Sequence, residues 1–122
     1  SDTYNNNNKY TLILNAGGLK RTVVIESNPV VAQIIFNANG GSGSTNPCEV
    51  RYSQLEGMAI LGKEITVHSV DIPVFISPSG MVFSGKWTYT SSGAEVPDDG
   101  NGNLTVTLHG STTYLSALWI DK

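Results

Sequence analysis

Two runs near the end of the chain alternate their side chains with the period of two that a β-strand imposes. In residues 104–109, Leu and Val alternate with Thr and His, and Gly110-Ser111 then breaks the pattern. Residues 114–120 (YLSALWI) form a second run, whose two faces are Leu115, Ala117 and Trp119 on one side and Tyr114, Ser116, Leu118 and Ile120 on the other. Since neither face of this second run is properly polar, both need cover, either from two sheets of the same domain or from another copy of the protein.

Short strands separated by turns rich in Gly, Pro and Asn occupy the rest of the sequence. The expected strands before the closing pair cover residues 9–15, 20–26, 30–37, 48–53, 64–70, 72–77 and 81–90. Gly85 predicts a bulge in the last of these, and residues 39–47 (NGGSGSTNP) form a long loop that is either a flexible tip or a binding loop. Apolar residues never recur at helical spacing over ten positions, so no helix longer than a single turn is expected. Eight to ten short strands predict an all-β fold, an antiparallel sandwich of the jelly-roll type.

Length and composition indicate the domain organisation and the broad class. A polar tract ends at Asn8, which predicts a flexible N-terminus over residues 1–8 and a single β-sandwich domain over residues 9–122. Charged residues make up 14% of the chain, against roughly 25% in an average domain, and short neutral polar residues are abundant, which favours a secreted or surface-exposed protein. The net charge of -3 gives no basic footprint for nucleic acid, and no apolar run is long enough to span a membrane.

Catalytic chemistry has little support in the sequence. No recognisable nucleophile, metalloprotease or phosphate-loop motif occurs, so we expect a binding protein without a cofactor rather than an enzyme. His68 and His109 lie in expected strands with Thr or Ser neighbours, where a polar residue on a sheet face is the simpler interpretation. Cys48 has no partner for an internal disulfide and is most simply a small buried thiol.

Residues 98–103 (DDGNGN) raise the question of a metal site. Asp98, Asp99 and Asn101 offer the oxygen ligands, and the glycines the tight turns, that calcium loops use. The segment lacks the glutamate that closes an EF-hand loop, and it equally matches a hairpin turn. We therefore expect no metal here and keep calcium as the alternative.

Aromatic and hydrogen-bonding side chains in the middle of the chain point to carbohydrate binding. Aromatic rings pack against the C–H groups of a sugar, and hydroxyl or guanidinium groups make directed hydrogen bonds to its hydroxyls. The residues of this kind are Tyr52, Arg51, Tyr89 and Trp87. Arg51 and Tyr52 are adjacent on an expected strand and so point to opposite faces, while Trp87 and Trp119 have a second interpretation as core residues.

Residues 79–87 (SGMVFSGKW) and 114–119 (YLSALW) resemble two segments of the bacterial fucose-binding lectin domains that have a tumour-necrosis-factor-like fold. Cys48, followed by Tyr52 and Ser53, is similar to a Cys-x-x-Tyr-Ser segment of that family, with one extra residue here. The resemblance implies a jelly-roll protomer, a homotrimer, and metal-free sites for fucosylated glycans between neighbouring protomers.

The same resemblance implies roles for particular residues. Tyr52 stands for the family's sugar-contacting tyrosine, and Lys63 stands where the family has an arginine. A second family arginine falls near Ser91, where this chain has none, and lysine cannot reproduce the bidentate fork of arginine. We therefore expect an oligomeric lectin whose candidate sugar-binding residues are Tyr52, Arg51, Lys63 and Tyr89. The alternative is a structural or receptor-binding β-subunit, such as a phage fibre head or a pilus-type protein, with the same fold and no sugar pocket.

Overall fold

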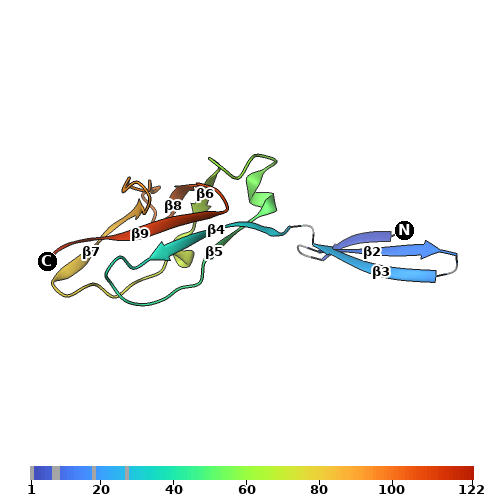
Figure 1. Ribbon diagram of the computed structural model, residues 1–122, viewed down its shortest axis with the longest axis horizontal. Helices are drawn as coiled ribbons and strands as arrows, with labels where there is room; N and C mark the ends of the chain where they lie inside the picture. The colour runs from blue at the N-terminus through green and yellow to red at the C-terminus, as the bar shows by residue number, and fades with distance from the viewer. Residues whose placement is uncertain (1, 7–8, 18, 27) are drawn as a thin grey trace.

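A computed structural model describes the backbone of residues 2–6, 9–17, 19–26 and 28–122 and the side chains of residues 28–122, and it is all-β (Figure 1). The strands are β1 (Asp2–Asn6), β2 (Lys9–Ala16), β3 (Leu19–Glu26), β4 (Val30–Asn37), β5 (Cys48–Arg51), β6 (Glu64–Val67), β7 (Met81–Tyr89), β8 (Leu104–Thr107) and β9 (Thr112–Asp121). Within these described ranges the helical elements are two 3-10 turns, η1 (Tyr52–Leu55) and η2 (Ser69–Asp71). The prediction that no helix exceeds a single turn is confirmed there. None of the described helical elements has the length and apolarity that crossing a membrane requires.

The first three strands form an antiparallel sheet of their own, in the order β1-β2-β3. Figure 1 shows this sheet extending from one end of the remaining strands. Part of the N-terminal segment expected to be flexible forms β1, while residues 1, 7 and 8 lie outside the described residues. The hairpin of β2 and β3 was expected inside the single sandwich, and in the structure it pairs with β1. The edge of β2 offers backbone donors and acceptors, and a polar strand such as β1 satisfies these groups as well as an apolar strand does.

A four-stranded sheet in the order β5-β4-β9-β7 forms the centre of the rest of the chain. β4 pairs antiparallel with β5, and β9 pairs antiparallel with β7, but β4 and β9 run parallel. The prediction of a purely antiparallel fold is therefore wrong at this pair. Parallel neighbours need a long crossover connection, and the long stretch between β4 and β9, which includes β5 to β8, supplies it.

A two-stranded antiparallel sheet, β6 with β8, shares one hydrophobic core with the four-stranded sheet. The period-two pattern decides which residues enter this core. Ile34 of β4, Val106 of β8 and Leu115 of β9 have no exposed surface. Two sheets over a common core agree with the predicted sandwich in its general form.

Two expected strands end two or three residues earlier than the sequence suggested, and one does not form. The strand expected over 48–53 ends at Arg51 and continues as η1, and the one expected over 64–70 ends at Val67 before η2. Residues 72–77 make a single bridge, between Ser42 and Ile76, instead of a strand. The bulge expected at Gly85 is confirmed, because the register of β7 against β9 shifts between Phe83 and Trp87.

Candidate functional site

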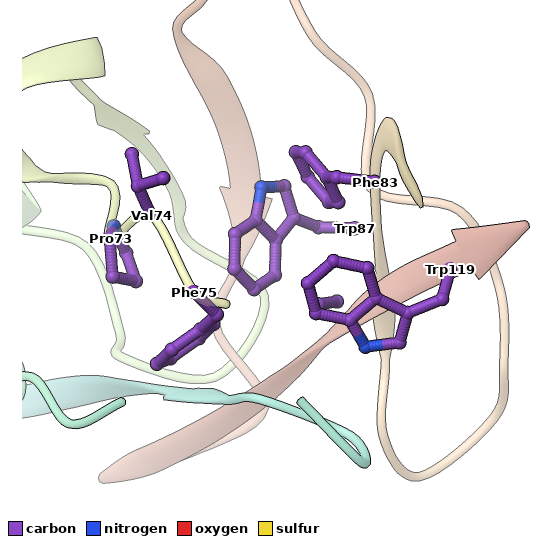
Figure 2. A pocket seen from close by; sticks show the side chains of 7 residues that line it. Pro73, Val74, Phe75, Phe83, Trp87 and Trp119 are labelled. Carbon is purple, nitrogen blue, oxygen red and sulfur yellow. The ribbon is translucent and has the colours of Figure 1, made fainter. Parts of the chain in front are cut away.

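A small apolar cavity lies between β7, β9 and the segment 72–76 (Figure 2). We call the segment 72–76 the strap. The volume of the cavity is about 60 Å³, several times what one water molecule needs. The lining residues are Pro73, Val74 and Phe75 of the strap, Phe83 and Trp87 of β7, and Ala117 and Trp119 of β9. We call this cavity the aromatic hollow.

The four rings of the aromatic hollow pack edge to face. Ring centroids lie 5.4 Å apart for Phe83 and Trp87, 5.7 Å for Phe83 and Trp119, and 6.0 Å for Phe75 and Trp87. Trp87 is buried in the core, while Phe83 is 41% exposed. Trp119 is fixed from the other side, because its indole Nε1 donates a hydrogen bond of 2.7 Å to the Ala38 carbonyl. Three of the rings are thus held by packing or by a hydrogen bond, and Phe83 opens to solvent.

A larger open groove of about 370 Å³ adjoins the aromatic hollow. The two cavities share Pro73, Val74, Phe83 and Trp87, and the groove continues along Ser69, Ile72, Gly85, Asp98, Gly100, Gly102 and Leu104. The bulge at Gly85 shapes one wall of the groove. It shifts the register of β7 against β9 between Phe83 and Trp87, and both of these residues line the groove. The groove therefore presents an aromatic ring and a carboxylate to the same space.

The Asp98 carboxylate in this groove is held in one orientation. Its Oδ2 accepts a hydrogen bond of 3.0 Å from Lys86 Nζ, and its Oδ1 accepts one of 3.0 Å from the Gly100 backbone N–H. The hydrogen bond from Lys86 is the main cause that keeps the pKa of Asp98 below its ordinary value, and the same contact raises the pKa of Lys86. Lys86 also lies 3.5 Å from Glu95, so one ammonium serves two carboxylates.

The neighbouring Asp99 organises the loop itself. Its Oδ1 accepts hydrogen bonds from the backbone of Asn101 and Asn103, and its Oδ2 accepts one of 2.8 Å from the Asn103 side-chain amide. Asn103 Oδ1 in turn accepts a hydrogen bond from the Ser69 backbone, at the start of η2. Among the residues that the structure describes, no group of three or more His, Cys, Asp or Glu is placed to hold a metal ion. The alternative calcium ligands Asp98, Asp99 and Asn101 thus lie in a loop built from internal hydrogen bonds, with an ammonium group already beside Asp98.

The outward face of β9 is a second feature of functional interest. Tyr114, Leu118 and Ile120 on this face are 51%, 36% and 48% exposed, whereas Leu115 and Ala117 on the opposite face are buried. Parallel pairing sets Ile35 beside Tyr114, and antiparallel pairing sets Val82 beside Ile120. We call these five residues (Ile35, Val82, Tyr114, Leu118 and Ile120) the outer face. None of them carries a charge, and the described part of the chain leaves the outer face open.

The sugar-binding residues proposed from the sequence lie elsewhere. Tyr52 begins η1 and is 54% exposed, and Arg51 donates a hydrogen bond of 3.0 Å to the Asn28 carbonyl. Lys63 Nζ lies 3.5 Å from Met58 Sδ and 4.0 Å from Glu56. These three residues come from one segment, 51–63, and none of them lines the hollow or the groove.

Tyr89 is placed in the core rather than with those three residues. It is 8% exposed, its hydroxyl accepts a hydrogen bond of 2.8 Å from the Thr107 backbone N–H, and its ring packs on His109 with the ring centroids 4.7 Å apart.

The lone Cys48 is partly buried, and burial raises the pKa of its thiol.

Sequence reasoning did not identify Phe83 and Asp98 as members of one site. Both belong to segments that it singled out, the Trp-containing strand and the acidic turn, but nothing in the spacing shows that these segments meet.

Comparisons with models of protein families, with curated proteins and with solved structures gave no match for this chain.

Proposed function

We propose that the protein is a non-enzymatic carbohydrate-binding protein that acts as an oligomer and binds its glycan in the groove. The observation that carries this proposal is that Phe83 and Asp98 line the same open groove. An exposed ring offers a surface for the C–H face of a sugar, and a fixed carboxylate accepts hydrogen bonds from sugar hydroxyls. A carboxylate already oriented by Lys86 and Gly100 loses little freedom when a ligand binds.

Assembly through the outer face is the second part of the proposal. A single groove of this size gives a modest affinity, and several grooves on one assembly raise the effective affinity without new contacts. The uncharged outer face is suited to contact a second copy, because charged residues are depleted at the centres of protein interfaces. The resemblance implies a homotrimer of tumour-necrosis-factor-like jelly rolls. The two sheets over one core support a β-sandwich in general, and the parallel β4–β9 pair departs from an all-antiparallel jelly roll.

The experiment is a glycan array on the wild-type protein, with fucosylated glycans as the first class of interest, followed by calorimetric titration of the best ligand. We expect Phe83→Ala and Asp98→Asn each to weaken binding by about tenfold or more, the effect of losing a ring contact or a charge-assisted hydrogen bond. Asp121→Asn, an isosteric change at an exposed residue at the end of β9, is the matched control and should bind normally.

Tyr52→Ala separates the groove from the position implied by the resemblance. If Tyr52→Ala abolishes binding and Phe83→Ala does not, the sugar site lies in the segment 51–63 and not in the groove. Absence of any bound glycan, together with intact assembly, would favour the alternative, a structural or receptor-binding subunit that uses the exposed outer face to contact another protein.

A further inference from the structure

The aromatic hollow has a chemical character of its own, distinct from that of the groove beside it. Four rings and a proline surround it, and its lining carries no charged side chain. Of the two indole N–H groups in the lining, that of Trp119 is engaged by the Ala38 carbonyl, so the described residues leave that of Trp87 as the indole donor. A sugar hydroxyl placed there would give up its hydrogen bonds to water for little in return. The hollow is thus matched to a group that needs no directed hydrogen bond.

One carboxylate, that of Asp98, lines the groove that adjoins the aromatic hollow. The hollow and the groove share Phe83 and Trp87 among their lining residues. Asp98 and Glu95 share the single ammonium of Lys86, so the local sum of these three charges is negative. The electron-rich faces of aromatic rings attract cations in the same sense as the carboxylates do. The ring cluster and its rim therefore favour a positive ligand over a neutral one of the same shape.

We propose that the aromatic hollow binds a methylated ammonium group, of the kind that choline carries. Such a group is apolar at its surface, positively charged and without a hydrogen-bond donor, which are the three properties that this lining selects. Phe83 is the ring that a ligand reaches first, because it is 41% exposed while Trp87 is buried behind it. This site takes a different class of ligand from the glycan groove and does not depend on glycan binding.

The test compares choline with its neutral carbon analogue, dimethylbutanol, in which carbon replaces the quaternary nitrogen. The two molecules have the same shape, so a difference between their binding affinities reports the effect of the positive charge. In calorimetric titration of the full chain we expect choline to bind and the neutral analogue to bind about tenfold more weakly or not at all. Fluorescence of Trp87 and Trp119, the two tryptophans, follows the same titration from within the hollow.

Two substitutions identify the origin of that difference. Phe83→Leu keeps an apolar wall but removes the ring, so it should weaken the binding of choline and leave the binding of the neutral analogue unchanged. Asp98→Asn should also weaken the binding of choline. Asp121→Asn, a carboxylate-to-amide change at the end of β9, should leave it unchanged.

Equal binding of choline and the neutral analogue would overturn the proposal. The hollow would then select methyl groups by shape alone, and the methyl group of a sugar would fit it equally well. Lack of binding of either probe would overturn it as well. Glycan binding is read separately on the array, so failure here and failure of the carbohydrate proposal are distinguishable.

Discussion

Gly41 lies directly against the indole of Trp119, since a β-carbon built on Gly41 would stand 2.6 Å from Trp119 Cζ2. The same carbon would stand 2.5 Å from the backbone oxygen of Ile76 in the strap. Backbone hydrogen bonds in both directions between Ser42 and Ile76 hold this contact in place. The loop of residues 39–47, for which the sequence allowed a flexible tip, is thus part of the support behind the aromatic hollow.

Gly41→Ala should therefore destabilise the fold and disturb the aromatic hollow. The neighbours are backbone and a fixed indole, so the added methyl forces a shift, at a cost of about 1–3 kcal/mol for overpacking. Denaturant unfolding measures the loss, and tryptophan fluorescence reports the change around Trp119. Ser44→Ala, at an exposed position of the same loop, is the control and should change the free energy of unfolding little. An unchanged Gly41→Ala protein would mean that the loop moves away from Trp119 in solution.

The contact between Lys86 and Asp98 predicts a pH dependence of stability. Because the folded pKa of Asp98 lies below its ordinary value of 3.8, its ionised form stabilises the fold. This contribution is complete above pH 3.8 and is lost as the pH falls through the lower, folded value. Lys86→Gln removes the main cause of the shift, so the Asp98 pKa should rise toward its ordinary value, as a carboxyl NMR titration would show. An Asp98 pKa unaffected by Lys86→Gln would show that the loop backbone alone sets it.

Tyr89→Phe distinguishes a core role from a sugar-binding role for this residue. Removing the hydroxyl leaves the partly buried Thr107 N–H without its acceptor, which costs about 1–3 kcal/mol. We expect a lower midpoint in denaturant and normal glycan binding. Tyr52→Phe, at an exposed position, is the control for the stability measurement alone. Loss of glycan binding at unchanged stability would restore Tyr89 to the site.

Local patterns in the sequence predicted the local structure well. The apolar run 30–37 and the alternating run 114–120 predicted strands whose inward residues, such as Ile34 and Leu115, are fully buried, and Gly85 predicted the bulge. These features depend on side-chain periodicity and on backbone freedom at one position, both of which are properties of a short segment.

Long-range relationships could not be predicted in the same way. The parallel pairing of β4 with β9 joins strands separated by the long stretch 38–111, and no turn signal specifies it. The groove likewise brings the strap, β7 and the loop of residues 98–103 together by tertiary packing. The strap itself looked like a strand, but beyond the Ser42–Ile76 bridge its residues pack around Trp87 instead of forming a ladder. For that reason the sequence identified the aromatic and acidic segments but not the groove that joins them, and its sugar-binding residues, Arg51, Tyr52, Lys63 and Tyr89, stay a prediction.

The last prediction concerns assembly through the outer face. Leu118 lies at its centre and is 36% exposed in the single chain, so Leu118→Glu adds a carboxylate without disturbing the core beneath it. If a second copy covers this face, the carboxylate is buried unpaired in the interface, at a cost of several kcal/mol. The variant should then sediment as a folded monomer, with strand-dominated circular dichroism, while the wild type sediments as a trimer. Leu61→Glu, at a residue 72% exposed and outside the outer face, is the matched control and should assemble normally. A wild-type protein that sediments as a single species near 13.0 kDa at micromolar concentration would contradict the trimer, and with it the gain in affinity that the carbohydrate proposal draws from several sites.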